Sequence, residues 1–459
     1  MQALIQNEDT IVALSTPQGI GAIGVIRLSG KDAITITDGI FHGKSLVDQD
    51  SHTIHFGTVR DNDKILDEVL ISLFIAPKSF TKENVVEISC HGSNYVIRQI
   101  MQLLIRKGAR TAKPGEFTKR AFLHGQFDLA QAEAVADLIN ADSEASHQAA
   151  LNQMRGGFSN DIKHLRDELV HFASMIELEL DFGEEDVEFA SREDLKALID
   201  KLLVVIDGLI KSFDLGNVIK NGVPTVIAGK PNAGKSTLLN ALLNEEKAIV
   251  SEIAGTTRDL IEDEVIIGGV AFRFIDTAGL RETTDVIEAI GVERTEASMK
   301  KASLIIYLFD LSTIDIVEMN KEINKLENAG VPFLKLGNKL DKATESQVES
   351  LQAQHPDMLF LSAKDPEQVE KLKERVLELV NLDKFKRGDT IVTNIRHYDS
   401  LLQTRNALMD VINGIDNQIT NDFVAMDIRQ SLHYLGEITG EITTDDLLTN
   451  IFGKFCIGK

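Results

Sequence analysis

A phosphate-binding loop between a strand-like and a helix-like segment constrains this chain more than any other feature. A short apolar run ends at Gly229, the chain turns through a Pro-Asn pair, and leucines then recur at helical spacing. The spacing G-x-x-x-x-G-K-S ends in Gly234, Lys235 and Ser236. Glycines let backbone N–H groups surround an anion, the helix N-terminus adds partial positive charge, the lysine reaches the outer phosphates and the serine hydroxyl binds Mg²⁺. The strand and helix on either side disfavour the alternative, a chance glycine turn.

Polar residues at the ends of later β-like runs predict which nucleotide is bound. Asp276 follows one such run, where its carboxylate can hold Mg²⁺ through water, and the Gly279 N–H can bond a γ-phosphate. Asp341 follows another run, and its ionised carboxylate suits the paired N–H groups of guanine while adenine's edge is mismatched. We therefore predict GTP binding. The residues expected to contact GTP are Asn232, Ala233, Gly234, Lys235, Ser236, Thr237, Ser251, Thr256, Thr257, Asp276, Thr277, Ala278, Gly279, Asn338, Lys339, Asp341, Ser362 and Ala363.

Leu280 stands where many GTPases carry a glutamine that orients the attacking water. In this respect the segment resembles translation-factor-type GTPases with an apolar residue at that place. An apolar side chain cannot orient a nucleophile, so the catalytic help has to come from elsewhere. A monovalent cation beside the β- and γ-phosphates could supply it, in place of an arginine finger that contributes about 10³- to 10⁵-fold. Asn232 is one candidate ligand, although such an asparagine is more often a turn residue.

Residues 1 to about 120 contain short β-like runs that alternate with turns, followed by an amphipathic helix near Tyr95 to Arg106, which predicts an α+β domain. Gly19-Ile-Gly21-Ala-Ile-Gly24 matches the dinucleotide fingerprint, but a strand-like run follows it in place of a helix, so we reject it as a nucleotide site. Arg27 and Glu87 each lie in a β-like run, and they could share a pocket or face solvent. The pattern alone favours solvent. Cys90 is expected to be a buried structural thiol.

Long helical patterns lie on both sides of the nucleotide-binding segment. Apolar residues recur at spacings of three and four over about 165–180 and 195–213, and the pattern resumes at 397–415. A helical domain interrupted by a complete α/β unit accounts for this order. The predicted fold is therefore multidomain α/β and α, with an α+β N-terminal domain (1–120), a discontinuous helical domain (121–220 and 382–459) and an inserted Ras-like P-loop GTPase domain (221–381).

The composition of the chain limits which partners it can bind and in which cellular compartment it is expected. A net charge of −23 argues against a broad surface that coats nucleic acid, because such binding depends on clustered Lys and Arg. The two cysteines, Cys90 and Cys456, lack metal-ligand spacing, so neither a disulfide framework nor a zinc site is expected. The first residues lack the pattern of a leader, and no apolar run is long enough to span a bilayer. We expect a cytoplasmic protein without membrane contact.

Several stretches taken together resemble one family over essentially the whole chain. They are the domain order, the switch sequence Ala254-Gly-Thr-Thr-Arg-Asp259, the stretch Pro114-Gly-Glu-Phe-Thr-Lys-Arg-Ala-Phe-Leu followed by Asp128-Leu-Ala-Gln-Ala-Glu-Ala, and the terminal Phe455-Cys-Ile-Gly-Lys459. The chain resembles the MnmE family of bacterial tRNA modification GTPases, also called TrmE. The terminal pentapeptide and the Pro-Gly-Glu-Phe stretch discriminate this family far better than the phosphate loop, which many GTPases share.

The resemblance implies an activity, cofactors and partners. Family members are K⁺-stimulated GTPases that work with the FAD-containing MnmG protein, as a heterotetramer. Together they install an aminomethyl or carboxymethylaminomethyl group on carbon five of the wobble uridine of certain tRNAs. The N-terminal domain would form a homodimer and bind a tetrahydrofolate derivative, 5,10-methylene- or 5-formyl-tetrahydrofolate, as the one-carbon source.

The resemblance also implies site residues, carried over position by position. Folate contacts fall on Arg27, Glu87, Lys459 and Gln126, where Gln126 replaces a family lysine and offers no charge to the folate glutamate tail. Potassium ligands fall on Asn232, Ser251, Ile253 and Thr256, and magnesium ligands on Ser236 and Thr257. The catalytic residues would be Glu288, Lys235 and Cys456. Without the resemblance, Glu288 would be interpreted as an ordinary exposed helix residue. For Cys456, a buried thiol in the tail is as plausible as a catalytic nucleophile.

Two functions from different classes remain. The first is an enzyme that couples GTP hydrolysis to wobble-uridine modification, and the second is a GTP-gated ribosome-assembly factor. Both predict the same nucleotide domain. An assembly factor usually carries a basic RNA-binding module, whereas this chain is acidic and has the folate-like domain and the Phe-Cys-Ile-Gly-Lys tail, which favours the enzyme.

Overall fold

The computed structural model describes residues 9–181, 191–245, 263–275, 299, 301–380 and 390–458. The chain divides into two compact units, each with its own sheet. The first unit comprises Met1–Ile139, Gln153–Leu203 and Ser400–Lys459, and the second comprises Asn140–Asn152 and Val204–Asp399.

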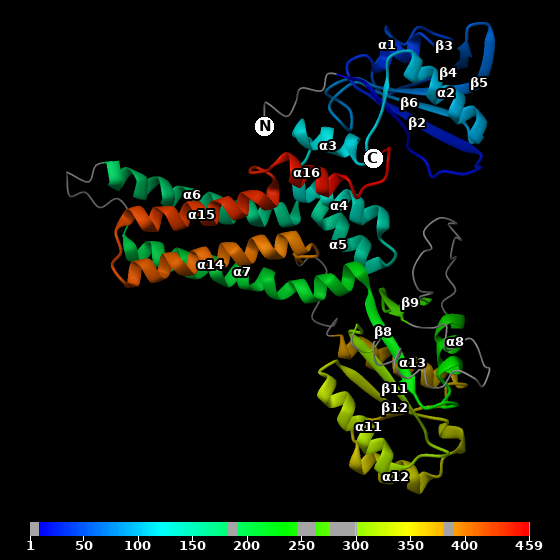
Figure 1. Cartoon of the computed structure of the whole chain (residues 1–459), viewed down its shortest axis with the longest axis vertical. Helices are drawn as coiled ribbons and strands as arrows, with labels where there is room; N and C mark the ends of the chain where they lie inside the picture. Colours follow the sequence, from blue (N-terminus) through cyan, green and yellow to red (C-terminus); the bar gives the residue numbers. More distant parts are fainter. Residues whose placement is uncertain are drawn as a thin grey trace. The chain divides into compact units, whose positions relative to one another are not determined.

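A mostly antiparallel, seven-stranded sheet in the order β3-β4-β5-β6-β2-β1-β7 opens the first unit (Figure 1). Alternate strand residues point to one face, where Ile71 and Ile88 form a core with Ile100 and Leu104 of helix α2. The strands are β1 (Ile11–Leu14), β2 (Ile23–Ser29), β3 (Phe41–His42), β4 (Thr53–Asp61), β5 (Lys64–Phe74), β6 (Val85–His91) and β7 (Arg110–Thr111). The helices of this part are α1 (Ala33–Asp38) and α2 (Asn94–Arg106). The glycine run at 19–24 leads into β2, as predicted, and not into a helix.

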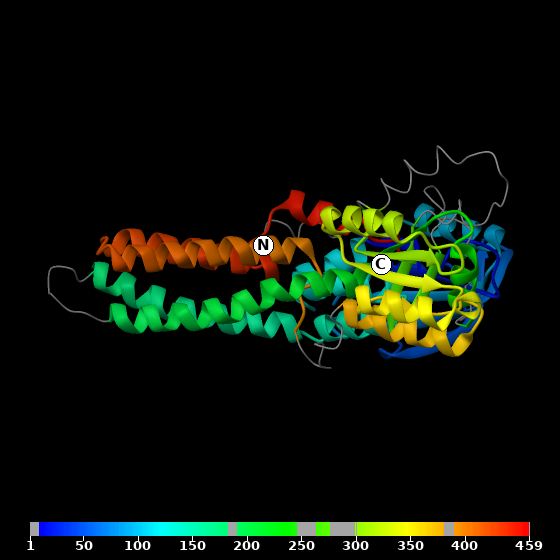
Figure 2. The ribbon, with the colours of Figure 1, turned by 90° about the horizontal axis from the view of Figure 1, so that it is seen from below.

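Helices from distant parts of the sequence pack together. In Figures 1 and 2, α6 lies beside α15, and α7 lies beside α14. Residues Leu165, Leu169 and Ile176 of α6 are buried at the spacing that the sequence predicts, and the buried Ile162 extends the same face beyond the predicted range. The helices are α3 (Glu116–Leu123), α4 (Leu129–Asn140), α5 (Glu144–Met154), α6 (Gly157–Asp181), α7 (Arg192–Asn221), α14 (Ile395–Asp416), α15 (Asn421–Thr439) and α16 (Asp445–Phe452). No helix in the described ranges has both the length and the apolar character needed to cross a membrane.

The second unit is built on a six-stranded sheet in the order β13-β12-β11-β8-β10-β9, parallel except where β9 pairs with β10. Six successive residues of β11 are buried because helices cover both faces. The strands are β8 (Val223–Gly229), β9 (Asp263–Ile267), β10 (Val270–Phe274), β11 (Leu304–Asp310), β12 (Phe333–Asn338) and β13 (Leu359–Phe360). The helices are α8 (Lys235–Glu245), α11 (Ile316–Ala329), α12 (Glu345–Gln354), α13 (Pro366–Leu379) and the 3-10 turn η2 (Leu340–Lys342). The predicted multidomain combination of α+β, helical and inserted α/β parts is confirmed.

Candidate functional site

The phosphate loop joins the carboxyl end of β8 to the first turn of α8. Gly229 has φ of 142°, and a Cβ there would lie 2.4 Å from the Leu308 carbonyl oxygen. Gly234 has φ of 98°, and its Cβ would lie 2.3 Å from Nδ2 of Asn338. Both positions therefore require glycine, for backbone conformation and for space. Asn232 adopts the left-handed conformation with φ of 60°, which asparagine tolerates better than most residues.

Lys235 is folded back over this loop. Its Nζ donates to the carbonyl oxygens of Gly229 at 2.8 Å and Lys230 at 3.0 Å. Burial lowers the pKa of Lys235 from its usual value, because the surroundings disfavour the charged form. An anion beside this ammonium would offset that cost. Ser236 is half-buried and Thr237 is exposed in the first turn of α8, where unpaired N–H groups favour phosphate.

Asn338, at the end of β12, ties the base-side loops to the phosphate loop. It is 2% exposed, and its Nδ2 donates to the Ala233 carbonyl at 2.7 Å. Its Oδ1 accepts from the backbone N–H of Ala363 at 3.0 Å. Ser362 donates from Oγ to the Asp341 carboxylate at 2.9 Å. The predicted residues Ala233, Asn338, Asp341, Ser362 and Ala363 are thus brought together at the carboxyl edge of the sheet, where open α/β sheets bind ligands.

Lys339 has a partner that the sequence did not single out. Its Nζ donates to the carboxylate of Asp310 at 2.6 Å, and Asp310 ends β11. Burial would raise the pKa of Asp310, but hydrogen bonds from Lys339 and Ser312 outweigh it and hold that pKa below its usual value. Only its position in the sequence could have indicated Asp310, because an acidic residue at the end of a buried parallel strand lies on the ligand-binding edge of the sheet.

Gln368 is a second missed residue. Its Oε1 accepts from the Ser362 N–H at 2.7 Å, while its Nε2 donates to Asp365 at 2.7 Å. Gln368 thereby braces the loop that carries Ser362 and Ala363. A glutamine in the first turn of α13 has no sequence signature for this role.

Part of the predicted nucleotide site lies outside the described residues. This applies to the second magnesium ligand, most potassium ligands, the residues after β10 and the predicted catalytic acid. The residues are Ser251, Ile253, Thr256, Thr257, Asp276, Thr277, Ala278, Gly279, Leu280 and Glu288. Lys459, a predicted folate contact, also lies outside them.

A second candidate site lies on the amino-terminal sheet. Arg27 of β2 and Glu87 of β6 are direct cross-strand neighbours, and the Arg27 Nε donates to Glu87 Oε1 at 2.9 Å. A second guanidinium nitrogen of Arg27 lies 2.7 Å from the same oxygen, with the two side chains 24% and 26% exposed. The two residues form a half-buried ion pair, so the reading as a purely solvated face is wrong.

The carboxy-terminal tail reaches this ion pair. The Gly458 carbonyl accepts from Arg27 Nη1 at 3.4 Å and from the Ser15 hydroxyl at 3.2 Å. The Gly115 N–H donates to the Cys456 carbonyl at 3.4 Å, which holds the tail at the start of α3. Gly458 has φ of 97°, and a Cβ there would lie 2.3 Å from the Leu14 carbonyl oxygen. The last described residue is therefore closely fitted against β1.

The two cysteines differ in environment. Cys90 is buried, its Sγ donates to the Gly24 carbonyl at 3.3 Å, and burial, helped by the nearby charge of Asp67, raises its pKa to about 11. The expected structural thiol is confirmed. Cys456 is exposed, so the alternative of a buried tail thiol is wrong. Gln126 is also exposed, just beyond the end of α3.

The fold and these loops define a P-loop GTP-binding domain joined to helical and amino-terminal sheet domains. The chain is 61% identical over 451 residues to the tRNA modification GTPase MnmE of Cytophaga hutchinsonii, covering 98% of both proteins. It is 54% identical to the protein of the same name from Flavobacterium psychrophilum, covering 98% of this chain and 99% of that protein. Family models described as "GTP-binding protein TrmE N-terminus" and "MnmE helical domain" match residues 10–126 and 129–456. This chain belongs to the MnmE family of tRNA modification GTPases.

Proposed function

We propose that this protein is the GTP-hydrolysing subunit of a complex that modifies tRNA. The complex adds an aminomethyl or carboxymethylaminomethyl group to carbon five of the wobble uridine, using a one-carbon unit from tetrahydrofolate. The contact between the Gly458 carbonyl and the Arg27 guanidinium carries the proposal. It brings the terminal motif that distinguishes the family against the pair expected to bind the folate.

The Arg27–Glu87 pair suits a tetrahydrofolate chemically. An ionised carboxylate accepts the paired N–H groups of a pteridine ring, and a guanidinium donates to its oxygens or to a carboxylate. Lys459 follows Gly458 directly and would add charge for the ligand. Gln126 would contribute a neutral hydrogen bond to the same ligand. Bound as 5,10-methylene- or 5-formyl-tetrahydrofolate, the cofactor would supply the one-carbon unit.

The same face of the sheet supports a homodimer. Ile54 and Phe56 of β4 are 66% and 68% exposed, and Leu70 of β5, opposite Phe56, is 46% exposed. The strand register places Ile54, Ser72, Glu87 and Arg27 in one cross-strand row. The apolar patch is therefore continuous with the candidate folate site. We propose that a second copy of the chain covers it, because such patches mark interaction surfaces.

GTP hydrolysis would use the phosphate loop and the adjoining switch segments. Lys235 would hold the outer phosphates, and Ser236 and Thr257 would bind Mg²⁺, which neutralises developing charge. Asn232, which is exposed in a left-handed turn, would bind K⁺ together with Ser251, Thr256 and the Ile253 carbonyl. Glu288 would position the attacking water, in place of the glutamine that Leu280 replaces.

We also propose the partners and the domain division. An FAD-containing MnmG protein would complete the complex, and much of the tRNA contact would fall on it because this chain carries a net charge of −23. The proposed nucleophile is Cys456, and its exposed side chain is consistent with that role. We place the domains at residues 1–120, at 121–220 with 382–459, and at 221–381, in a cytoplasmic protein.

Nucleoside analysis of tRNA from a deletion strain tests the proposal. Mass spectrometry should show loss of the modified wobble uridine, restored by the wild-type gene and not by an Arg27→Ala gene. Unchanged wobble uridines, together with an accumulation of ribosome precursors, would establish the assembly-factor alternative instead. A GTPase assay in K⁺ against Na⁺ tests the cation separately, since equal turnover removes Asn232 from its proposed role.

A further inference from the structure

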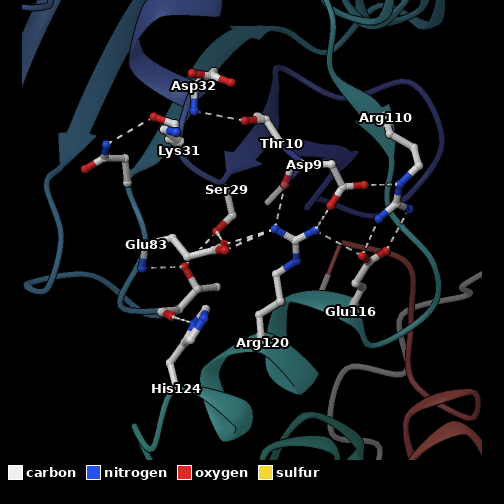
Figure 3. Close-up of polar contacts among 12 residues, drawn as sticks. Asp9, Thr10, Ser29, Lys31, Asp32, Glu83, Arg110, Glu116, Arg120 and His124 are labelled. Carbon is white, nitrogen blue, oxygen red and sulfur yellow. Dashed lines mark hydrogen bonds and ion pairs between the residues drawn. The ribbon is translucent and has the colours of Figure 1, made fainter. Parts of the chain in front are cut away.

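Five charged side chains form a compact cluster beside the candidate folate site, and none of them is an expected folate contact. They are Asp9, Glu83, Arg110, Glu116 and Arg120, and we name them the α3 anchor cluster (Figure 3). Arg120 is 5% exposed and Glu116 is 7% exposed. Charged residues are this deeply buried only when they are paired, so the arrangement is specific.

Arg120 lies at the centre of the cluster. Its guanidinium donates to the Asp9 carboxylate at 2.7 Å, to the Asp9 carbonyl at 2.8 Å and to Glu83 at 3.1 Å. Asp9 precedes β1, Glu83 precedes β6 and Arg120 belongs to α3. One planar side chain therefore joins three segments that are far apart in sequence, a geometry that suits arginine and not lysine.

Arg110 closes the cluster from β7. Its Nε donates to Asp9 at 2.6 Å and its Nη1 donates to Glu116 at 3.1 Å. Glu116 also accepts the Lys113 N–H at 2.7 Å, which fixes the first turn of α3. Figure 3 shows Asp9 and Glu116 both placed between the two arginines.

Helix α3 also carries the contacts that support the folate pair and the tail. Phe117 follows Glu116, is fully buried, and its ring centroid lies 5.8 Å from the Arg27 guanidinium carbon. An arginine over an aromatic face is attracted to it and held in orientation. Gly115 lies just before the helix, and its N–H donates a hydrogen bond to the Cys456 carbonyl. A Cβ at Gly115 would lie 2.5 Å from the Phe452 carbonyl oxygen. Displacement of α3 would therefore disturb both Arg27 and the tail.

We propose that the α3 anchor cluster sets the position of the Arg27–Glu87 pair and of the carboxy-terminal tail, with Arg120 as the central positioning residue. The effect passes through Phe117 to Arg27 and through Gly115 to Cys456 and Gly458. This inference rests on the proposed folate-binding function. It adds residues of α3 that touch neither the cofactor nor the nucleotide but determine whether the cofactor site is assembled.

Arg120→Gln tests the proposal, with Arg106→Gln as its matched control. Arg106 lies in the same part of the chain and makes an exposed ion pair with Asp61 at 2.6 Å. Its substitution therefore removes one positive charge, as Arg120→Gln does, but at a position outside α3. Two measurements are made on the full-length protein: the Kd for 5-formyl-tetrahydrofolate by calorimetry, and hydrogen exchange of the peptides that contain Gly115 and Gly458. The kcat and KM for GTP are the third readout.

We expect Arg120→Gln to raise the folate Kd about tenfold or more and to speed exchange at both peptides, because a buried charge network is broken. The GTP constants should stay within about twofold of wild type, and Arg106→Gln should match wild type throughout. Arg120→Lys should recover part of the folate affinity, since lysine keeps the positive charge but lacks the planar guanidinium that bonds several partners at once. A purely stabilising role would lower the melting temperature and leave the Kd unchanged well below it.

The outcomes separate this inference from the function on which it rests. A folded Arg120→Gln protein with wild-type folate Kd and wild-type exchange would overturn the positioning role. A wild-type protein that does not bind the folate would refute the proposed cofactor. In that case, hydrogen exchange of the Gly458 peptide in Arg120→Gln and wild type would still decide whether the cluster positions the tail. If Arg120→Gln does not fold, Phe117→Leu leaves the cluster intact, and an unchanged Kd and exchange in that variant would refute the pathway.

Discussion

Asn338 and Ala233 are joined by a hydrogen bond of 2.7 Å from the asparagine Nδ2 to the alanine carbonyl, although 105 positions separate them. The bond connects the loop after β12 to the phosphate loop after β8. Since Asn338 also accepts from the Ala363 N–H, one amide holds three nucleotide-site loops in register. These two hydrogen bonds fix the three loops relative to one another.

Asn338→Ala should weaken GDP and GTP binding by about 10- to 100-fold. The substitution leaves a buried carbonyl and a buried N–H without their partner, which costs about 1–3 kcal/mol. Calorimetric titration with GDP measures the effect. Asn324→Ala, at an exposed position of α11, should bind as wild type does, and equal affinity in the two variants would contradict the prediction.

Asp310→Asn should raise the Kd for GDP about fivefold, because it removes the charge that holds Lys339. Asp357→Asn is the control, since Asp357 also pairs with a lysine, Lys335 at 3.0 Å, but this lysine lies within β12, whereas Lys339 directly follows the strand. Fluorescent-nucleotide titration of both variants gives the comparison. If Asp357→Asn weakens binding as much as Asp310→Asn, the effect is not local to Lys339.

Glu288→Ala should abolish GTP hydrolysis while leaving GTP affinity within about twofold of wild type. A residue that positions water acts on the chemical step and not on nucleotide binding. Single-turnover phosphate release and a separate titration with a non-hydrolysable GTP analogue distinguish the two effects. Retained turnover would mean that another group positions the water.

Acid should loosen α3 in the wild type and bring its stability towards that of a Glu116→Gln variant, which lacks this charge at every pH. Burial opposes ionisation of Glu116, but hydrogen bonds from Arg110 and Lys113 outweigh it and hold its pKa below the usual 4.5. A lowered pKa stabilises the fold fully above about pH 4.5, and this contribution is lost as the pH falls through the lower, folded-state pKa. Hydrogen exchange of α3 should therefore separate wild type from Glu116→Gln at pH 7 by more than it does near pH 3.

Gly458→Ala should displace the tail without unfolding the protein. The added Cβ would meet the Leu14 carbonyl at 2.3 Å, and φ of 97° is strained for alanine. Gly108→Ala is a matched control, because Gly108 has φ of 111° with open space around its Cβ. Loss of 5-formyl-tetrahydrofolate binding in Gly458→Ala alone would support the tail contact, and normal binding in both would refute it.

The sequence predicts most of the fold because periodicity reports burial directly. The spacing of apolar residues in α6 and the apolar run that ends at Gly229 both reappear in the structure, the second as the largely buried strand β8. Strand β4 has the opposite pattern, since Ile54 and Phe56 point outward while Gly57 and Val59 are buried. Alternation predicts that the apolar residues of a strand face the core, so it does not predict a strand whose apolar residues face outward.

Site residues followed a different rule. Lys235, Asn338 and Asp341 belong to motifs with fixed spacing, so their grouping at one sheet edge could be predicted. Arg120 and Asp310 could not, because their roles depend on partners, Asp9 and Lys339, whose proximity is created only by folding. The ion pair of Arg27 and Glu87 needed the β2–β6 register, which a pattern of charged strand residues does not contain.

The buried position of Gly458 has a practical consequence for handling the protein. Any purification tag or fluorescent fusion attached after Lys459 would begin two residues beyond Gly458, whose backbone carbonyl accepts hydrogen bonds from Ser15 and Arg27. Such an extension would start close to the place where the cofactor is proposed to bind. Assays of one-carbon chemistry should therefore use protein tagged at the opposite end or released from its carboxy-terminal tag without leftover residues.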